Sequence, residues 1–116
     1  YTDIAWSSSG GQKRVSSSES FLFSLKCHAG LPAVKMSIKD GQHSNAVYHD
    51  SRYGPSFGHD YFGIYCDLLI ALCSDSIQTN LSNSGHAYHL PDGVTDPYFL
   101  TGSREFEVAD YEVFQV

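Results

Sequence analysis

The chain has 116 residues, of which 41% are hydrophobic, and a formal net charge of −6. This length and composition suit a single domain with a compact core over residues 1–116. Its seven Lys and Arg residues are scattered, with Lys13-Arg14 as the only adjacent pair, so nucleic acid is a poor choice of partner. The sequence has no run of about 18 apolar residues, which excludes a membrane-spanning helix.

Strand patterns dominate the first half of the chain. Residues 7–20 are rich in Ser and Gly and predict a loop, whereas Phe21–Leu25 is an aromatic segment between polar ones and predicts a strand. Val34–Ile38 alternates apolar and polar residues, as a half-buried strand does. Asn45–His49 alternates again after a turn signal at residues 40–41. We therefore expect these last two strands to pair as a hairpin.

The second half predicts one central strand between polar loops. Residues 54–63 hold three glycines and one proline and predict a loop, and Ile64–Cys73 predicts the central buried strand. Residues 74–85 are polar and carry the sequon Asn80-Leu81-Ser82, which we expect in a loop that tolerates glycosylation. Residues 104–116 predict the closing strand. We therefore predict an all-β fold, an antiparallel β-sandwich with long loops and at most short helices.

Several segments, taken in order, resemble the TLDc domain family. They are Tyr1–Trp6, Phe21–Leu25, Asn45–Tyr48, Gly54–Asp60, Asp67–Ile70, Ser82–Tyr88 and Phe99–Val116. The sequence lacks the elements that the family usually carries upstream of the first segment, and residues 61–66 resemble an insertion. The resemblance implies a β-sandwich module that is not chiefly enzymatic. It also implies a link to protection against oxidative damage or to binding of the proton-pumping vacuolar ATPase inside cells.

The composition of the loops is typical of a site for neutral sugars. Aromatic rings stack on sugars, while Asp and Asn side chains accept hydrogen bonds from hydroxyl groups. The candidate ligand-binding residues are Trp6, Asp50, Tyr53, His59, Asp60, Asp92 and Asp96. Carboxylates are also the ligands that calcium prefers, so Asp60, Asp92 and Asp96 are the candidate metal ligands. Pro91-Asp92-Gly93 is equally a common turn sequence that needs no metal.

Two His-Asp pairs, His49-Asp50 and His59-Asp60, flank the glycine-rich segment. Imidazole and carboxylate groups bind transition metals, so a zinc site would form if the two pairs converged. The alternative is that they shape a strand end and a loop without a metal, and we favour it because metal sites usually show tighter spacing.

Three cysteines leave at least one thiol unpaired within the chain; they are Cys27, Cys66 and Cys73. A disulfide between the last two would require a sharp turn between them, because its α-carbons must come within about 7 Å of each other. A disulfide between Cys27 and either of the other two is sterically easier. All three as buried thiols is the simplest interpretation, and it leaves the cellular compartment open.

We expect a non-enzymatic recognition module, and the leading hypothesis is a secreted, lectin-like protein that binds neutral sugars, with calcium as an optional cofactor. Two observations favour the secreted lectin: the sequon, and the start at Tyr1 without a methionine, which indicates a processed or trimmed chain. A homo-oligomer is expected, because multivalency strengthens weak sites. The alternative is a cytoplasmic TLDc-type module that docks on a protein. A third hypothesis is a metal-dependent hydrolase that uses the His-Asp pairs.

Overall fold

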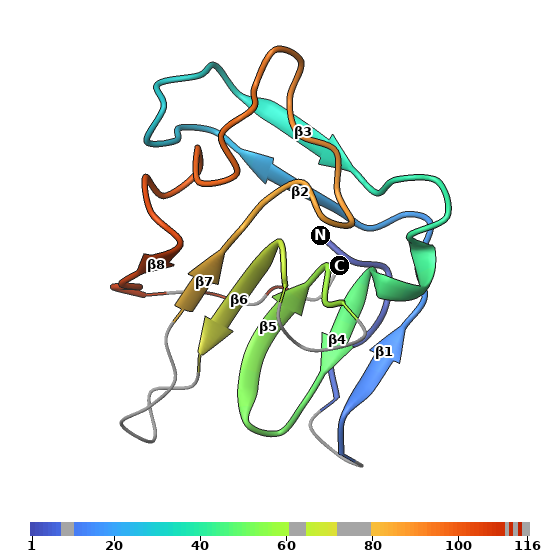
Figure 1. The fold of residues 1–116 in the computed structure, drawn as a ribbon. Helices are drawn as coiled ribbons and strands as arrows, with labels where there is room; N and C mark the ends of the chain where they lie inside the picture. The colour runs from blue at the N-terminus through green and yellow to red at the C-terminus, as the bar shows by residue number, and fades with distance from the viewer. Residues whose placement is uncertain (8–10, 61–64, 72–79, 111, 113, 115–116) are drawn as a thin grey trace.

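In the computed structural model, residues 1–7, 11–60, 65–71, 80–110, 112 and 114 are described. Within them the chain forms a short 3-10 helix, η1 (His43–Asn45), and a set of antiparallel strands. The strands are β1 (Lys13–Val15), β2 (Phe21–Ser24), β3 (Val34–Ser37), β4 (Val47–His49), β5 (Tyr53–Phe57), β6 (Leu68–Ala71), β7 (Asn80–Ser82) and β8 (Glu105–Phe106). One sheet has the order β1-β4-β5-β6-β7-β8, and β2 pairs with β3 in a second sheet (Figure 1). The predicted all-β fold is therefore confirmed.

The two sheets pack on each other around a buried core. Met36 of β3 enters it from the small sheet, and Val47 of β4 and Phe57 of β5 enter it from the large sheet. Tyr88 is fully buried among them, and its hydroxyl donates a hydrogen bond to the carbonyl of Ala46 at 2.9 Å. Burial of each large apolar side chain contributes about 1.5–3 kcal/mol, so this core holds the two sheets together.

Two predicted strands are confirmed as β2 and β3, whose alternate side chains Leu22 and Met36 enter the core. The prediction that β3 pairs with the strand in residues 45–49 is wrong. β3 pairs with β2, whereas β4 pairs with β1 and β5. The reason lies in the connection, where Gly41 turns the chain with a φ of 80° and η1 then carries it from the small sheet to the large one.

The prediction of a loop over residues 54–63 is wrong for residues 54–57, which belong to β5. Gly54 and Pro55 lie where the register between β5 and β6 shifts, and such a bulge is a place where a strand tolerates proline. A Cβ atom on Gly54 would lie 2.9 Å from the carbonyl oxygen of Ile70. Glycine here therefore allows the two strands to approach each other closely.

Two further strands lie where polar loops were predicted. β1 falls within residues 7–20 and β7 within residues 74–85, so both loop predictions are wrong at those positions. β7 pairs with β6 and places Leu81 opposite Leu69. Pairing with a neighbouring strand stabilises these two strands, although their own composition does not predict a strand.

The predicted central strand is confirmed over residues 68–71 as β6, whereas residues 65–67 are irregular and residues 64, 72 and 73 lie outside the described residues. The predicted closing strand is confirmed only as β8, because residues 107–110 are irregular. In the part of the chain that the structure describes, no helix is long and apolar enough to cross a membrane.

The long connection between β7 and β8 lies against the small sheet. Ile38, directly after β3, forms an antiparallel bridge with Tyr88 of this connection. Farther along it, the carbonyl of Leu100 accepts a hydrogen bond from the N–H of His28 at 3.1 Å. These contacts place the segment that carries Asp92 and Asp96 beside β2 and β3, rather than beside the β4–β5 turn (Figure 1).

Candidate recognition sites

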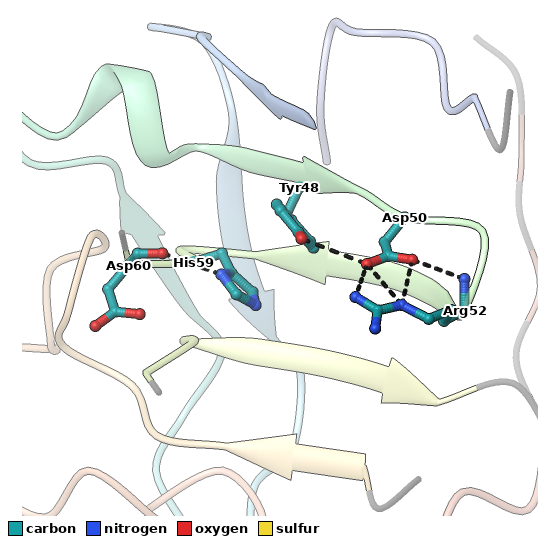
Figure 2. Close-up of polar contacts among 5 residues, drawn as sticks. All are labelled: Tyr48, Asp50, Arg52, His59 and Asp60. Atoms are coloured by element: carbon teal, nitrogen blue, oxygen red, sulfur yellow. Dashed lines mark hydrogen bonds and ion pairs between the residues drawn. The ribbon is translucent and has the colours of Figure 1, made fainter. Parts of the chain in front are cut away.

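The turn between β4 and β5 is held by an ion pair between Asp50 and Arg52 (Figure 2). Arg52 Nη2 lies 2.7 Å from Asp50 Oδ2, and Arg52 Nε lies 3.0 Å from Asp50 Oδ1. The backbone N–H of Arg52 donates to the same carboxylate at 2.9 Å. The hydrogen bonds from the Arg52 side chain are the main cause that lowers the pKa of Asp50 below its ordinary value of 3.8. The buried Asp50 carboxylate therefore fixes the turn.

Tyr48 and His59 extend this turn into a row of side chains. Their rings stack with centroids 4.0 Å apart and an angle of 15° between the planes, and both residues are buried. The hydroxyl of Tyr48 lies 3.4 Å from Asp50 Oδ2, so the row runs from His59 to Arg52 (Figure 2). The sequence pattern predicts Asp50 and His59 as site residues, whereas only the structure shows that Tyr48 and Arg52 complete their surroundings. Burial raises the pKa of Tyr48, which keeps its hydroxyl neutral and able to donate.

Asp60 and Tyr53 lie at the two ends of the row. The carboxylate of Asp60 accepts a hydrogen bond from the N–H of Tyr65 at 3.3 Å. Tyr53 packs against the small apolar cluster that contains Leu69, and the guanidinium of Arg52 lies 5.5 Å from its ring centroid. The structure therefore places Asp50 and Tyr53 at the turn of the β4–β5 hairpin and His59 and Asp60 beyond its other end, with Tyr48 between the two pairs (Figure 2).

Trp6 lies on the other face of the large sheet. Its ring centroid is 5.4 Å from the ring centroids of both Phe57 and His49, so it covers the core between the sheets. Side chains alternate between faces along a strand, so His49 and Tyr48 point in opposite directions from β4. The two predicted His-Asp pairs therefore do not converge. Burial lowers the pKa of His49, which favours a neutral ring in this apolar setting.

Asp92 and Asp96 are both exposed on the connection between β7 and β8. Asp92 is part of a turn that the N–H of Val94 closes on the carbonyl of Pro91 at 3.0 Å. The carboxylate of Asp96 accepts a hydrogen bond from the N–H of Tyr98 at 2.9 Å. Among the described residues, no three His, Cys, Asp or Glu side chains are grouped so that they could hold a metal ion. Calcium stays a prediction from the sequence.

The predicted sequon does not lie in a loop. Asn80 is the first residue of β7, and both ends of its side-chain amide form hydrogen bonds. Asn80 Oδ1 accepts from the N–H of Ala71 at 2.9 Å, and its Nδ2 donates to the carbonyl of Phe106 at 3.0 Å. Ser82 is fully buried. The predicted loop is therefore wrong at this sequon, and the Asn80 amide links β6, β7 and β8.

Two of the three cysteines are described, and both are buried free thiols: Cys27 in the core between the sheets and Cys66 beside Leu69. The interpretation as buried thiols is confirmed for these two. Cys73 lies outside the described residues.

The outer face of the small sheet is an apolar surface that sequence analysis missed. Phe23 and Leu25 point away from the core and are 56% and 75% exposed. Phe21 lies next to Phe23, with ring centroids 6.2 Å apart, and Tyr1 stacks on Phe21 at 5.0 Å. A signal was present, because residues 21–25 place apolar side chains at both odd and even positions, whereas a strand with one buried face needs only one set. We call Tyr1, Phe21, Phe23 and Leu25 the aromatic row.

A family model described as TLDc domain matches residues 1–116, which is the whole chain. This chain belongs to the TLDc domain family. The resemblance found in the sequence is therefore confirmed. Neither the curated proteins nor the solved structures contain a significant match to this TLDc domain.

Asp67 joins two of the segments that carried the TLDc resemblance. Its side chain is fully buried and accepts hydrogen bonds from three successive backbone N–H groups. Oδ1 accepts from Gly85 at 2.6 Å and from His86 at 3.0 Å, and Oδ2 accepts from Ala87 at 2.7 Å. Burial raises the pKa of this carboxyl, and the three N–H donors offset part of that effect. Asp67 thus holds the start of the β7–β8 connection of this TLDc domain against β6.

Proposed function

We propose that this TLDc domain is a non-enzymatic recognition module that docks on a protein partner through the aromatic row. The observation that carries the proposal is the exposure of Phe23, on a strand paired with β3, and of Leu25, directly after that strand. Apolar side chains that stay in contact with water in neighbouring positions are typical of interaction surfaces. Large aromatic residues also contribute most of the binding energy in many interfaces.

The architecture supports a binding role for this face. The opposite side of β2 and β3 packs on the core through Leu22 and Met36, so the sheet presents the aromatic row on a fixed support. A surface that is already ordered loses little conformational entropy when a partner binds. The TLDc family membership of the chain agrees with a protein-interaction role.

The sugar, calcium and secretion hypotheses stay predictions from the sequence. Four of the seven candidate residues lie along the β4–β5 hairpin, Asp50 and Tyr53 at its turn and His59 and Asp60 beyond its other end, and the buried Asp50 carboxylate is engaged by Arg52. A glycan-array screen, run once with calcium and once with a chelator, tests them. Binding of a defined sugar would support the lectin hypothesis, and its loss on chelation would support the calcium site.

Site-specific photocrosslinking in cells tests the protein-docking proposal. A photoreactive phenylalanine analogue replaces Phe23 in one variant and Tyr65 in the control variant. Tyr65 is a suitable control, because it is 50% exposed and lies outside the small sheet. We expect a discrete covalent protein adduct from position 23 and none of the same mass from position 65. The absence of an adduct at position 23, or the same adducts at both positions, would contradict docking through this face.

A further inference from the structure

We infer that the occupant of the aromatic row is an extended, acidic peptide segment of a partner, with apolar side chains on Phe23 and Leu25 and carboxylates on Lys26 and Lys35. This inference rests on the proposed docking function and names the chemistry of the partner. Two features of the small sheet carry it: the shape of its apolar surface and the distribution of charge around it.

The apolar surface is a narrow row rather than a broad patch. Phe21 and Phe23 are alternate residues of β2, and Leu25 follows directly after the strand. Alternate side chains on a strand repeat at about 6.6–6.8 Å. An extended peptide has the same spacing between its alternate side chains. The apolar residues of such a peptide can therefore meet Phe21 and Phe23 in succession. Tyr1 closes the row at one end by stacking on Phe21.

The charge beside the row is positive, although the whole chain has a net charge of −6. Lys35 lies directly opposite Phe23 in the register, and its Nζ is 4.0 Å above the ring centroid of Phe21. Lys26 follows Leu25 and is exposed. β2 and β3 themselves contain no acidic residue. A carboxylate of a peptide bound along the row would therefore be attracted by the ammonium groups of Lys26 and Lys35. It would not be repelled by an acidic residue of β2 or β3.

Charged side chains of both signs lie at the end of the small sheet near Phe21, because Glu19 precedes β2 whereas Lys39 and Asp40 follow β3. Lys26 lies at the opposite end of β2. The positive charge beside the row itself comes from Lys26 and Lys35, and this local charge favours a peptide that carries carboxylates.

A defined peptide panel tests this inference on the intact chain. The probes are three fluorescein-labelled twelve-residue peptides with a Gly/Ser background: one with two Phe, one Leu and four Glu, one with the Glu replaced by Lys, and one with the apolar residues replaced by Ser. Fluorescence anisotropy measures binding at two salt concentrations. We expect the acidic apolar peptide to bind at least about tenfold more tightly than either control peptide, and to weaken as salt rises.

Two variants assign the binding to this face. Phe23→Ser and Lys35→Glu should each weaken binding of the acidic apolar peptide at least about tenfold, and Lys35→Glu should also improve binding of the lysine peptide. The matched controls are Tyr65→Ser, at a similarly exposed aromatic residue, and Lys13→Glu, at an exposed lysine of β1. Both should bind as the wild type does. Thermal melting tests whether each variant is folded. We expect all four to be folded, because the substituted side chains are exposed.

Several outcomes would overturn the inference. They are the absence of binding by any peptide, equal binding of the acidic and lysine peptides, and binding that both Phe23→Ser and Lys35→Glu leave unchanged. Sedimentation of the free chain gives a further outcome that would overturn it. A dimer that Phe23→Ser converts to a monomer would show that the occupant of this face is a second copy of the chain. Failure of the peptide panel together with a partner adduct at position 23 would reject the acidic peptide and keep the docking function.

Discussion

Gly58 lies against the buried carboxylate of Asp67, and a Cβ atom at Gly58 would overlap Asp67 Oδ2 and stand 2.7 Å from its Cγ. The glycine also adopts a φ of 70°, in the left-handed region. This contact places the end of β5 beside the carboxylate that holds Gly85, His86 and Ala87. Only glycine combines the backbone conformation with the space that the carboxylate needs.

Gly58→Ala should destabilise the domain more than Gly30→Ala does. Both glycines have nearly the same φ, 70° and 71°, but a Cβ atom on Gly30 would meet nothing within 4 Å. The left-handed conformation costs each variant about 1–2 kcal/mol. Overlap with Asp67 should add about 1–3 kcal/mol at Gly58 alone. Chemical denaturation measures both variants, and equal losses would show that the carboxylate can move aside.

Asp67→Asn should lower the free energy of unfolding by about 1–3 kcal/mol. The amide can accept hydrogen bonds only through its oxygen, so its NH₂ group would face one of the three N–H donors, such as that of Ala87. Asp40→Asn is the control, because Asp40 is exposed. Urea titrations of the two variants and the wild type test this. If Asp67→Asn lost no more stability than the control variant, the three hydrogen bonds to the Asp67 carboxylate would not stabilise the fold.

The stability of the domain should depend on pH in two opposite ways. Arg52 lowers the pKa of Asp50, so the unfolded chain binds more protons there, and stability rises with pH up to about the ordinary value of 3.8. Burial raises the pKa of Asp67, so the folded chain binds more protons there, and stability falls as pH rises above 3.8 toward the raised value. The Tm measured from pH 2.5 to 7 should show both trends.

Single variants separate the two contributions to this profile. Asp50→Asn should flatten the rise on the acid side, and Arg52→Gln should reproduce that effect, because it removes the main cause of the lowered pKa of Asp50. Asp67→Asn should instead flatten the fall above pH 3.8. A wild-type profile retained by both Asp50→Asn and Asp67→Asn would show that other groups control it.

Asn80→Ala should destabilise the domain, although the variant also removes the sequon. The substitution leaves the N–H of Ala71 and the carbonyl of Phe106 without their side-chain partner, a loss of about 1–3 kcal/mol. Asn83→Ala is the matched control, because it removes an amide of the same size from the residue just beyond β7. Thermal and urea unfolding compare them. Equal stabilities would contradict a structural role for the Asn80 amide.

A strand such as β2 or β3 could be predicted from the sequence because its apolar side chains alternate with outward-facing ones. Leu22 and Met36 alternate with outward-facing residues, so β2 and β3 were found from the pattern. β1, β5 and β7 contain Lys, Gly, Pro, Asn or Ser, and their strand conformation depends on pairing with a neighbour. The bulge at Gly54 has the composition of a turn, so only the register with β6 reveals it.

The candidate site was predicted in part for a similar reason. Asp50, Tyr53, His59 and Asp60 lie along one hairpin because they are close to one another in the sequence. Asp92 and Asp96 belong to the β7–β8 connection, and its position is set by the contacts of Tyr88 and Leu100 with the small sheet. Contacts of this kind join residues tens of positions apart, and no local pattern encodes them.

The buried position of Cys66 has a consequence for redox chemistry. Burial, with the nearby Asp67 carboxylate as a further cause, raises the pKa of this thiol to about 12. The thiolate is the form that attacks peroxides, disulfides and alkylating reagents, and at neutral pH very little of Cys66 is in that form. Cys66 is therefore unsuited to act as a peroxide-reactive sensor. The contribution of Cys66 to this TLDc domain is therefore to packing, in the apolar cluster that contains Leu69.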